Sequence, residues 1–270
     1  MPTKIEWCDE TINPLGWGCY GPEGTPENPK RCSYCYAYRM AKRSFRDCPQ
    51  CREFVPHWHP EQYNRLQDFT QPKRIFLQSM GDLWHPAISY SLKRNAMSYV
   101  QYYPQHTFLA LTKCAEAAYR FFQEYKPEAL TPNLHFGITA ENQPALEKRV
   151  FWLLRIPGIA IRWVSLEPLL GDIDLTNIQS DKWTRMNVLE GCGVTTRPGI
   201  SGQSLPNCYC ERISWVVIGA MTGPGAIKPK LEWIQSIVDQ CRVAGVPVFL
   251  KDNLQDIWPG KLIQEFPEVA

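Results

Sequence analysis

Short apolar runs rich in aromatic and β-branched residues recur along the chain and predict buried strands. They lie at residues 74–80, 106–112, 134–139, 160–167, 214–220 and 246–251. Apolar residues are nearly continuous within these runs, which is typical of parallel strands covered on both faces. A first strand is expected at residues 4–8, which brings the total to about seven.

Between these runs, apolar residues recur at helical spacing and predict amphipathic helices. The three clearest faces are formed by Leu92, Ala96, Val100 and Tyr103; by Leu146, Val150, Leu153 and Leu154; and by Leu231, Ile234, Val238 and Cys241. The last helix has Pro229 near its start and Gly245 where a C-terminal cap belongs, as expected for a helix with well-defined ends.

The order of strands and helices predicts an α/β fold. Strand starts lie roughly 26 to 32 residues apart, apart from one longer gap before residue 214, which is the spacing of successive βα units. About seven such units favour a full or partial parallel β/α barrel, TIM-like, over an open doubly wound sheet. We expect a single domain over residues 1–270, with insertions at about 43–70 and 176–212, and chemistry at the carboxyl ends of the strands.

Composition and charge narrow the class of protein. The chain has 270 residues, 44% of them hydrophobic, which excludes a disordered chain. The start of the sequence lacks a secretory pattern and no apolar run reaches about 18 residues, so we expect a cytoplasmic protein without a membrane partner. In a reducing compartment its eleven cysteines are better explained as metal or cluster ligands than as disulfides. The net charge of +2 neither supports nor excludes a nucleic-acid partner.

Polar residues follow the predicted strands and converge on one rim. The candidates are Gly81, Asp82, Lys113, Glu141, Asn142 and Glu167. The five polar side chains could bind the amine, carboxylate and hydroxyl groups of a ligand, and Gly81 lets the backbone approach a ligand closely. Each could instead be a turn or helix-cap residue, but together they predict a small-molecule site.

Three cysteines, Cys19, Cys32 and Cys35, follow the first predicted strand and lie on the same rim. Three thiolates can bind zinc with a fourth ligand from elsewhere, or bind three irons of a [4Fe-4S] cluster and leave the fourth iron open. A zinc knuckle usually shows two short pairs, whereas here Tyr34 precedes the last thiol of a single pair. This is the terminal half of the radical S-adenosylmethionine (SAM) signature.

Further motifs extend the similarity along the chain. In order they are KIEW, CSYCYAYRMAKR, FVPHWHPE, IFLQSMGDLW, PQHTFLALTK, FGITAENQ, SLEPLLGDIDL, WVVIGAMTGPGA and VPVFLKDN. With these motifs the chain, from about Lys4 to Pro267, resembles the three-cysteine-motif family encoded by phages and prokaryotes. That family is regarded as radical-SAM-like and distantly similar to spore photoproduct lyase.

The resemblance implies a partial β/α barrel of the radical-SAM type, with a [4Fe-4S] cluster on Cys19, Cys32 and Cys35 and SAM on the open iron. A one-electron donor such as a ferredoxin or flavodoxin would then be a partner. Twelve residues separate Cys19 from Cys32, more than in the usual radical-SAM motif, so the cluster loop must follow a different path.

We assign roles to the rim residues on this basis. Asp82 and Lys113 are the expected contacts to the amino-acid part of SAM, and Glu141, Asn142 and Glu167 the contacts to its ribose or to the substrate. The cofactor would supply the radical chemistry while the barrel orients it and excludes water. The catalytic group is unknown; Glu167 and His59 are candidates.

A second metal site, zinc or a second cluster, is predicted from the remaining cysteines. Its four thiolates would come from Cys48, Cys51, Cys208 and Cys210, with Cys192, His57 or His59 as substitutes; the alternative is unpaired loop thiols. His57 and His59 alternate as on an extended segment, so we expect them to point to opposite sides, with His59 an acid–base group, a ligand or a structural histidine. Cys8 is expected in the first strand, and Cys114 and Cys241 in the core.

Basic residues at helical spacing after the cluster loop suggest phosphate contact. They are Arg39, Lys42, Arg43 and Arg46, and the aromatic residues Tyr36, Tyr38, Trp58 and Tyr63 nearby could stack on bases; the alternative is a solvated helix face with aromatics packed beneath. Two functions therefore follow from the sequence. One is a radical-SAM-like enzyme acting on nucleic acid or a nucleotide; the other is a metal-stabilised barrel that binds nucleic acid or a protein partner without radical chemistry.

Overall fold

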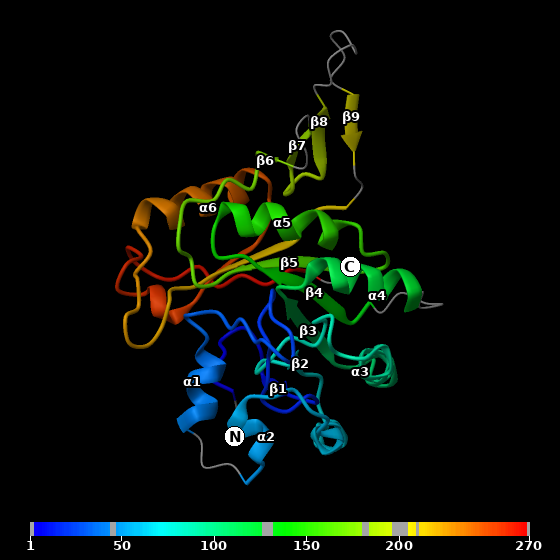
Figure 1. Cartoon of the computed structure of the whole chain (residues 1–270). Helices are drawn as coiled ribbons and strands as arrows, with labels where there is room; N and C mark the ends of the chain where they lie inside the picture. Colours follow the sequence, from blue (N-terminus) through cyan, green and yellow to red (C-terminus); the bar gives the residue numbers. More distant parts are fainter. Residues whose placement is uncertain are drawn as a thin grey trace. The chain divides into compact units, whose positions relative to one another are not determined.

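Seven strands form the main sheet in the order β1-β2-β3-β4-β5-β10-β11, which follows the chain (Figure 1). A computed structural model describes residues 3–43, 47–125, 132–179, 184–195, 205–208 and 211–268. The strands are β1 Glu10–Ile12, β2 Arg74–Leu77, β3 Thr107–Thr112, β4 Leu134–Thr139, β5 Ile161–Leu166, β10 Trp215–Ile218 and β11 Val248–Leu250. The pairs β1/β2, β2/β3, β5/β10 and β10/β11 are all parallel. The α/β class is thus confirmed, and the order agrees with a partial parallel β/α barrel.

The apolar runs from residue 74 onward are confirmed as β2, β3, β4, β5, β10 and β11, with β4 at its predicted bounds and the others shorter, but the expected strand at residues 4–8 is wrong. Cys8 lies in a turn, where its N–H donates to Ile5 O at 3.2 Å. The first strand is β1, whose register starts at Glu10 opposite Ile75. Asp9 holds the start of β1 beside β2, because its carboxylate accepts a hydrogen bond from the N–H of Arg74 at 2.7 Å. β1 therefore owes its strand conformation to β2, since three residues with one buried apolar side chain give no periodic signal.

The helices are α1 Tyr36–Arg43, α2 Pro49–Glu53, α3 Tyr90–Tyr102, α4 Ala115–Tyr125, α5 Gln143–Leu154 and α6 Leu231–Val243, with 3₁₀ turns at Pro60–Asp68 and Asp252–Leu254. The faces predicted for α3, α5 and α6 are largely buried, and Cys241 belongs to the core. Leu231, placed on the apolar stripe of α6, is instead exposed at the first turn. Gly245 has φ +66° directly after α6 and ends it as expected.

The chain divides into two compact units. The first comprises Met1–Gly137 and Ile156–Ala160, and the second Ile138–Arg155 and Ile161–Ala270. In the first unit, Trp84 packs edge-on against Phe136 at a centroid distance of 4.7 Å. In the second unit, Trp163 of β5 packs against Trp215 of β10 at 5.0 Å. Each unit thus has its own buried aromatic centre.

The two expected insertions hold distinct structure. The first contains α2 and the 3₁₀ turn Pro60–Asp68. The second forms an antiparallel sheet in the order β6-β7-β8-β9, with β6 Ile178–Gln179, β7 Thr184–Asn187, β8 Cys192–Thr195 and β9 Leu205–Cys208. Among the helices described here, none has the length and apolarity that a membrane crossing needs.

Candidate functional site

The cysteine loop leaves β1 and closes on itself before α1 begins. Lys30 N–H donates to Tyr20 O at 2.8 Å, which brings the chain back beside its starting point. Gly21 permits this turn: its φ is +85°, and a Cβ there would lie 1.8 Å from Lys30 O. The long gap between Cys19 and Cys32 is therefore folded into a compact loop.

The three thiols of this loop are half-buried and share one electrostatic environment. The pKa of Cys19 is raised to about 12, chiefly by burial and also by the Asp82 carboxylate and the thiols of Cys35 and Cys32. Burial also raises the pKa of Cys35, which the charge of Lys113 opposes. Cys35 N–H donates to Cys32 O at 3.0 Å, and Cys19 and Cys35 pack against the same buried cluster that contains Phe54 and Met80. The structure thus brings the three cysteines together with two of the predicted rim residues.

Asp82 fixes the carboxyl ends of β2 and β3 to each other. Its carboxylate accepts hydrogen bonds from Thr112 Oγ1 at 2.8 Å, Lys113 N at 2.9 Å and Trp84 N at 3.1 Å. The Lys113 ammonium then donates to Tyr34 Oη at 2.6 Å and lies 4.6 Å from the centre of that ring. Because Tyr34 lies between Cys32 and Cys35, this network ties the strand ends directly to the cysteine pair.

Gly81 was expected to let a ligand approach the backbone closely. In the structure, the backbone of Gly18 makes this close approach. The two glycines form an isolated parallel bridge, and Gly18 N–H donates to Met80 O at 3.1 Å. A Cβ on Gly81 would lie 2.2 Å from Gly18 O. Gly81 therefore positions the residue immediately before Cys19.

The remaining rim candidates lie in the second unit and have local partners there. Arg149 donates to Glu141 Oε2 at 2.9 Å, and Lys251 to Glu167 Oε1 at 2.8 Å. Asn142 caps α5, accepting the N–H of Ala145 at 3.0 Å. The helix-cap alternative therefore describes Asn142, while Glu141 and Glu167 are partly buried members of ion pairs.

A second group of metal-ligating side chains lies in the first unit, on α2 and the segment after it. Ligand atoms of Cys48, Cys51, His57 and His59 all lie within 4.8 Å of one another. The pKa of Cys48 is lowered to about 6, chiefly by the backbone N–H of Cys51 and also by the two histidines. Two cysteines and two histidines at this spacing can bind a metal such as zinc.

The expectation that His57 and His59 point to opposite sides is wrong, because their Nε2 atoms lie 2.6 Å apart. The segment is not a regular strand: His57 N–H donates to Leu15 O, and His59 N–H to Pro14 O. Gly16 leaves room for the rings, since a Cβ there would lie 2.6 Å from His59 Cδ2 and 2.7 Å from His57 Cε1.

The compact group thus contains the two histidines that were expected as substitute ligands. Cys192 of β8 and Cys208 of β9 are Cα partners in the register of the antiparallel strands, and Cys210 lies outside the described residues. The four-thiolate version of the second site stays a prediction. The CxxC pair was visible in the sequence, and FVPHWHPE carried the other two ligands without a periodic signal.

The basic face after the cysteine loop is partly neutralised. Lys42 of α1 pairs with Glu53 at 3.3 Å, while Arg46 lies outside the described residues. Tyr63 cannot stack on bases as proposed from the sequence, because it is buried and stacks on Tyr99 at 3.7 Å. Tyr36 is 43% exposed and donates to Ser79 O. Of these aromatic side chains, Tyr36 is accessible on the α1 surface.

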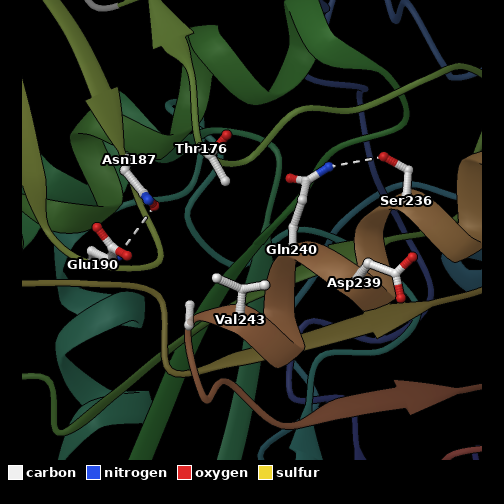
Figure 2. A pocket seen from close by; sticks show the side chains of 8 residues that line it. Thr176, Asn187, Glu190, Ser236, Asp239, Gln240 and Val243 are labelled. Carbon is white, nitrogen blue, oxygen red and sulfur yellow. Dashed lines mark hydrogen bonds between the residues drawn. The ribbon is translucent and has the colours of Figure 1, made fainter.

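A separate hollow of about 380 Å³ lies in the second unit beside α6 (Figure 2). Its lining includes Thr176, Asn187, Glu190, Ser236, Asp239 and Gln240. Figure 2 shows the Gln240 amide turned toward the Ser236 hydroxyl, to which it donates at 3.1 Å. None of the residues that the sequence singles out lines the described part of this hollow.

Comparisons with known proteins identify a family for the chain but assign it no function. Neither a curated protein nor a solved structure matches the chain. A sequence model of one family, described as "Protein of unknown function (DUF5131)", matches residues 2–257, nearly the whole chain. The chain therefore belongs to the DUF5131 family.

Proposed function

We propose that the protein is an iron–sulfur enzyme that holds a [4Fe-4S] cluster on Cys19, Cys32 and Cys35 and uses SAM at the open iron. The carrying observation is that three thiols gather beside Asp82 and Lys113 at the carboxyl ends of β2 and β3. This is where parallel β/α folds place their chemistry. A thiolate trio with a carboxylate and an ammonium next to it suits a cofactor with both amino and carboxylate groups.

The donor set fits a cluster better than a single ion. Three thiolates in a cubane bind three different irons, so their sulfurs are spread more widely than around one metal. Among the described residues, the compact group whose ligand atoms lie within 4.8 Å of one another is the Cys/His group and not this trio. Burial and the Asp82 charge disfavour bare thiolates here, and a bound cation reverses that preference.

The chain's own residues position this site. Asp82 holds the ends of β2 and β3, so that Lys113 and the cysteine loop share one rigid edge. Lys113 contacts Tyr34 and presents a positive charge next to Cys35, where it can meet the carboxylate of SAM. A cluster with an open iron supplies one-electron reduction, which in SAM enzymes splits the sulfonium carbon–sulfur bond.

The proposed substrate is nucleic acid or a nucleotide. Arg39 and Lys42 lie on α1, which begins directly after Cys35, and Tyr36 is exposed on the same helix. The Lys42–Glu53 pair reduces the positive charge available for phosphate. A small or single-stranded substrate therefore fits this surface better than long duplex contacts.

The experiment is metal and sulfide analysis of anaerobically purified protein, followed by paramagnetic resonance with and without SAM and an assay for 5′-deoxyadenosine. We expect about four irons per chain, a SAM-dependent spectrum and product formation. Cys19→Ala, Cys32→Ala and Cys35→Ala should each lose the iron. A spectrum that does not change when SAM is added, or zinc bound by the three cysteines, would reject the proposed enzyme activity. The protein would then be a metal-stabilised binding protein.

A further inference from the structure

The Cys/His group is held by partners that aim both imidazoles at one point. His57 Nδ1 lies 2.7 Å from Val55 O, a carbonyl that can only accept, so this nitrogen carries the proton. His59 Nδ1 contacts the Glu61 carboxylate, which assigns its proton in the same way. Metal-ligating histidines usually have their second nitrogen fixed like this, by a carbonyl or a carboxylate.

As a result, the unprotonated nitrogens of the two histidines and the two cysteine sulfurs all lie close to one point. In neutral rings with protonated Nδ1 both Nε2 atoms are bare, yet they lie 2.6 Å apart. Cys48 Sγ lies 3.0 Å from His57 Nε2, and Cys51 Sγ lies 3.7 Å and 3.6 Å from the Nε2 atoms of His57 and His59. A proton can relieve one nitrogen–nitrogen contact. A metal cation relieves all of these contacts at once.

Two of the sulfur–nitrogen distances match those around one tetrahedral ion. With Zn–S near 2.3 Å and Zn–N near 2.0–2.1 Å, a tetrahedral centre separates sulfur from nitrogen by about 3.6 Å. The distances of Cys51 to both histidines, 3.7 and 3.6 Å, agree with this value. Cys48 Sγ lies only 3.0 Å from His57 Nε2 and the two Nε2 atoms only 2.6 Å apart, so these atoms have to move apart when the ion binds. In a Rieske-type cluster the cysteines and histidines bind different irons, which would move the sulfurs away from the nitrogens. Two thiolates and two imidazoles around one point are typical of zinc.

The group also contacts the segment that leads into the cysteine loop. Trp17 N–H donates to Cys51 Sγ at 3.4 Å, and Gly16 packs on both imidazoles. A Cβ on Gly18 would lie 2.3 Å from Pro56 N, between the cysteine pair and His57. Phe54, directly after α2, belongs to a buried cluster against which Cys19 and Cys35 pack. The Cys/His group and two cysteines of the loop are therefore connected through Trp17, Gly18 and the Phe54 cluster.

We propose that Cys48, Cys51, His57 and His59 bind one Zn²⁺ that holds the segment Pro14–Gly18 in place and thereby fixes Cys19. Zinc binding itself stands on the Cys/His geometry alone; its benefit to a cluster rests on the proposed function. Because zinc at such a site contributes directly to folding free energy, the segment before Cys19 is ordered before any cluster is inserted.

Zinc and iron analysis of the full chain and its variants tests the site. Wild-type protein should contain about one zinc per chain, and Co²⁺ in its place should give the absorption bands of a tetrahedral thiolate site. Cys48→Ser and Cys51→Ser should lose the zinc, while Cys19→Ala should keep it. Cys192→Ser is the matched control because this exposed cysteine was the sequence-based substitute ligand, and it should also keep the zinc.

Two further measurements keep the test decisive if a cysteine variant fails to fold. Glu61 is exposed, so Glu61→Gln should fold normally yet hold zinc about 10- to 100-fold more weakly, because His59 loses its orienting carboxylate. In wild-type protein, chelation should speed amide hydrogen exchange at Trp17 and Gly18, whether or not iron is present. No zinc in wild type, unchanged zinc in both cysteine variants, or unchanged exchange after chelation would each overturn the proposal.

The two proposals fail separately. Zinc present with iron absent from Cys19, Cys32 and Cys35 rejects the cluster and leaves the zinc site standing. Iron present with the Cys/His group free of zinc rejects the zinc site and leaves the cluster. If zinc loss leaves cluster insertion at wild-type level, the zinc does not position Cys19, and that part of the proposal is wrong.

Discussion

Replacement of Gly81 by alanine probes the contact that places the cysteine loop on the strand ends. The added Cβ would lie 2.2 Å from Gly18 O, whereas an ordinary contact begins at 3.4 Å, so the two backbone segments must separate by about 1.2 Å. Neither side can yield easily. Gly18 is itself packed on Pro56 and bound to Met80 O, and the new Cβ also lies 3.0 Å from the buried Gln78 side chain.

The expected cost follows from this overlap. Overpacking of a tight contact costs about 1–3 kcal/mol, and each kcal/mol lowers the Tm of a chain of this size by about 2–4 °C. A displacement of about 1 Å at a reacting centre can also reduce the rate about 100-fold. We therefore expect Gly81→Ala to lower both the Tm and the iron bound by the three-cysteine loop.

The assay compares Gly81→Ala with Gly171→Ala, in which the new Cβ would meet no atom closer than 3.7 Å. Thermal unfolding and iron content are measured on the same anaerobic preparations. Gly171→Ala should match wild type in both. If Gly81→Ala also matches wild type, the Gly18–Gly81 contact does not position the loop and the reasoning fails.

Three other predictions concern single side chains. Lys113→Met keeps the aliphatic stem but removes the ammonium that contacts Tyr34; iron should stay while the SAM-dependent change in the paramagnetic spectrum disappears, and an unchanged response would exclude Lys113 from the site. Glu141→Ala leaves the Arg149 guanidinium, 10% exposed, without its carboxylate at 2.9 Å, so urea unfolding should show a loss of about 3–5 kcal/mol; a much smaller loss would mean that solvent replaces the carboxylate. Burial lowers the pKa of His135 from 6.5 to about 4, so the unfolded chain binds more protons between these values and stability falls as pH decreases through this window, by up to about 3 kcal/mol. His135→Gln should flatten that part of the stability profile, and a profile like that of wild type would contradict the assignment.

The fold was largely predictable because its strands are buried on both faces. Near-continuous apolar runs locate β2, β3, β4, β5, β10 and β11, since a parallel sheet covered by helices needs little polar surface. Pro229 before α6 and Gly245 after it also predicted the limits of this helix, because both residues act through the local backbone conformation. β1 was missed because its three residues become a strand only through pairing with β2.

The candidate sites were predictable only in part. Spacing alone identifies Cys32 and Cys35 as a pair and Cys48 and Cys51 as another, because a CxxC turn brings both thiols to one side. The partners of each pair depend on contacts between distant segments. Lys30 folds back to Tyr20 and so returns Cys19 toward its pair, a path that twelve intervening residues do not encode by periodicity.

The sequence by itself determined the α/β class, the positions of β2, β3, β4, β5, β10 and β11, and the cysteine pairs, because these depend on local burial patterns and short spacings. Only the tertiary structure decided that His57 and His59 converge on Cys48 and Cys51. The physical reason is that their backbone is bonded to Pro14 and Leu15, and the missing side chain of Gly16 leaves space for both rings. An alternating extended segment would have separated them, and contacts more than forty residues away in sequence prevent it.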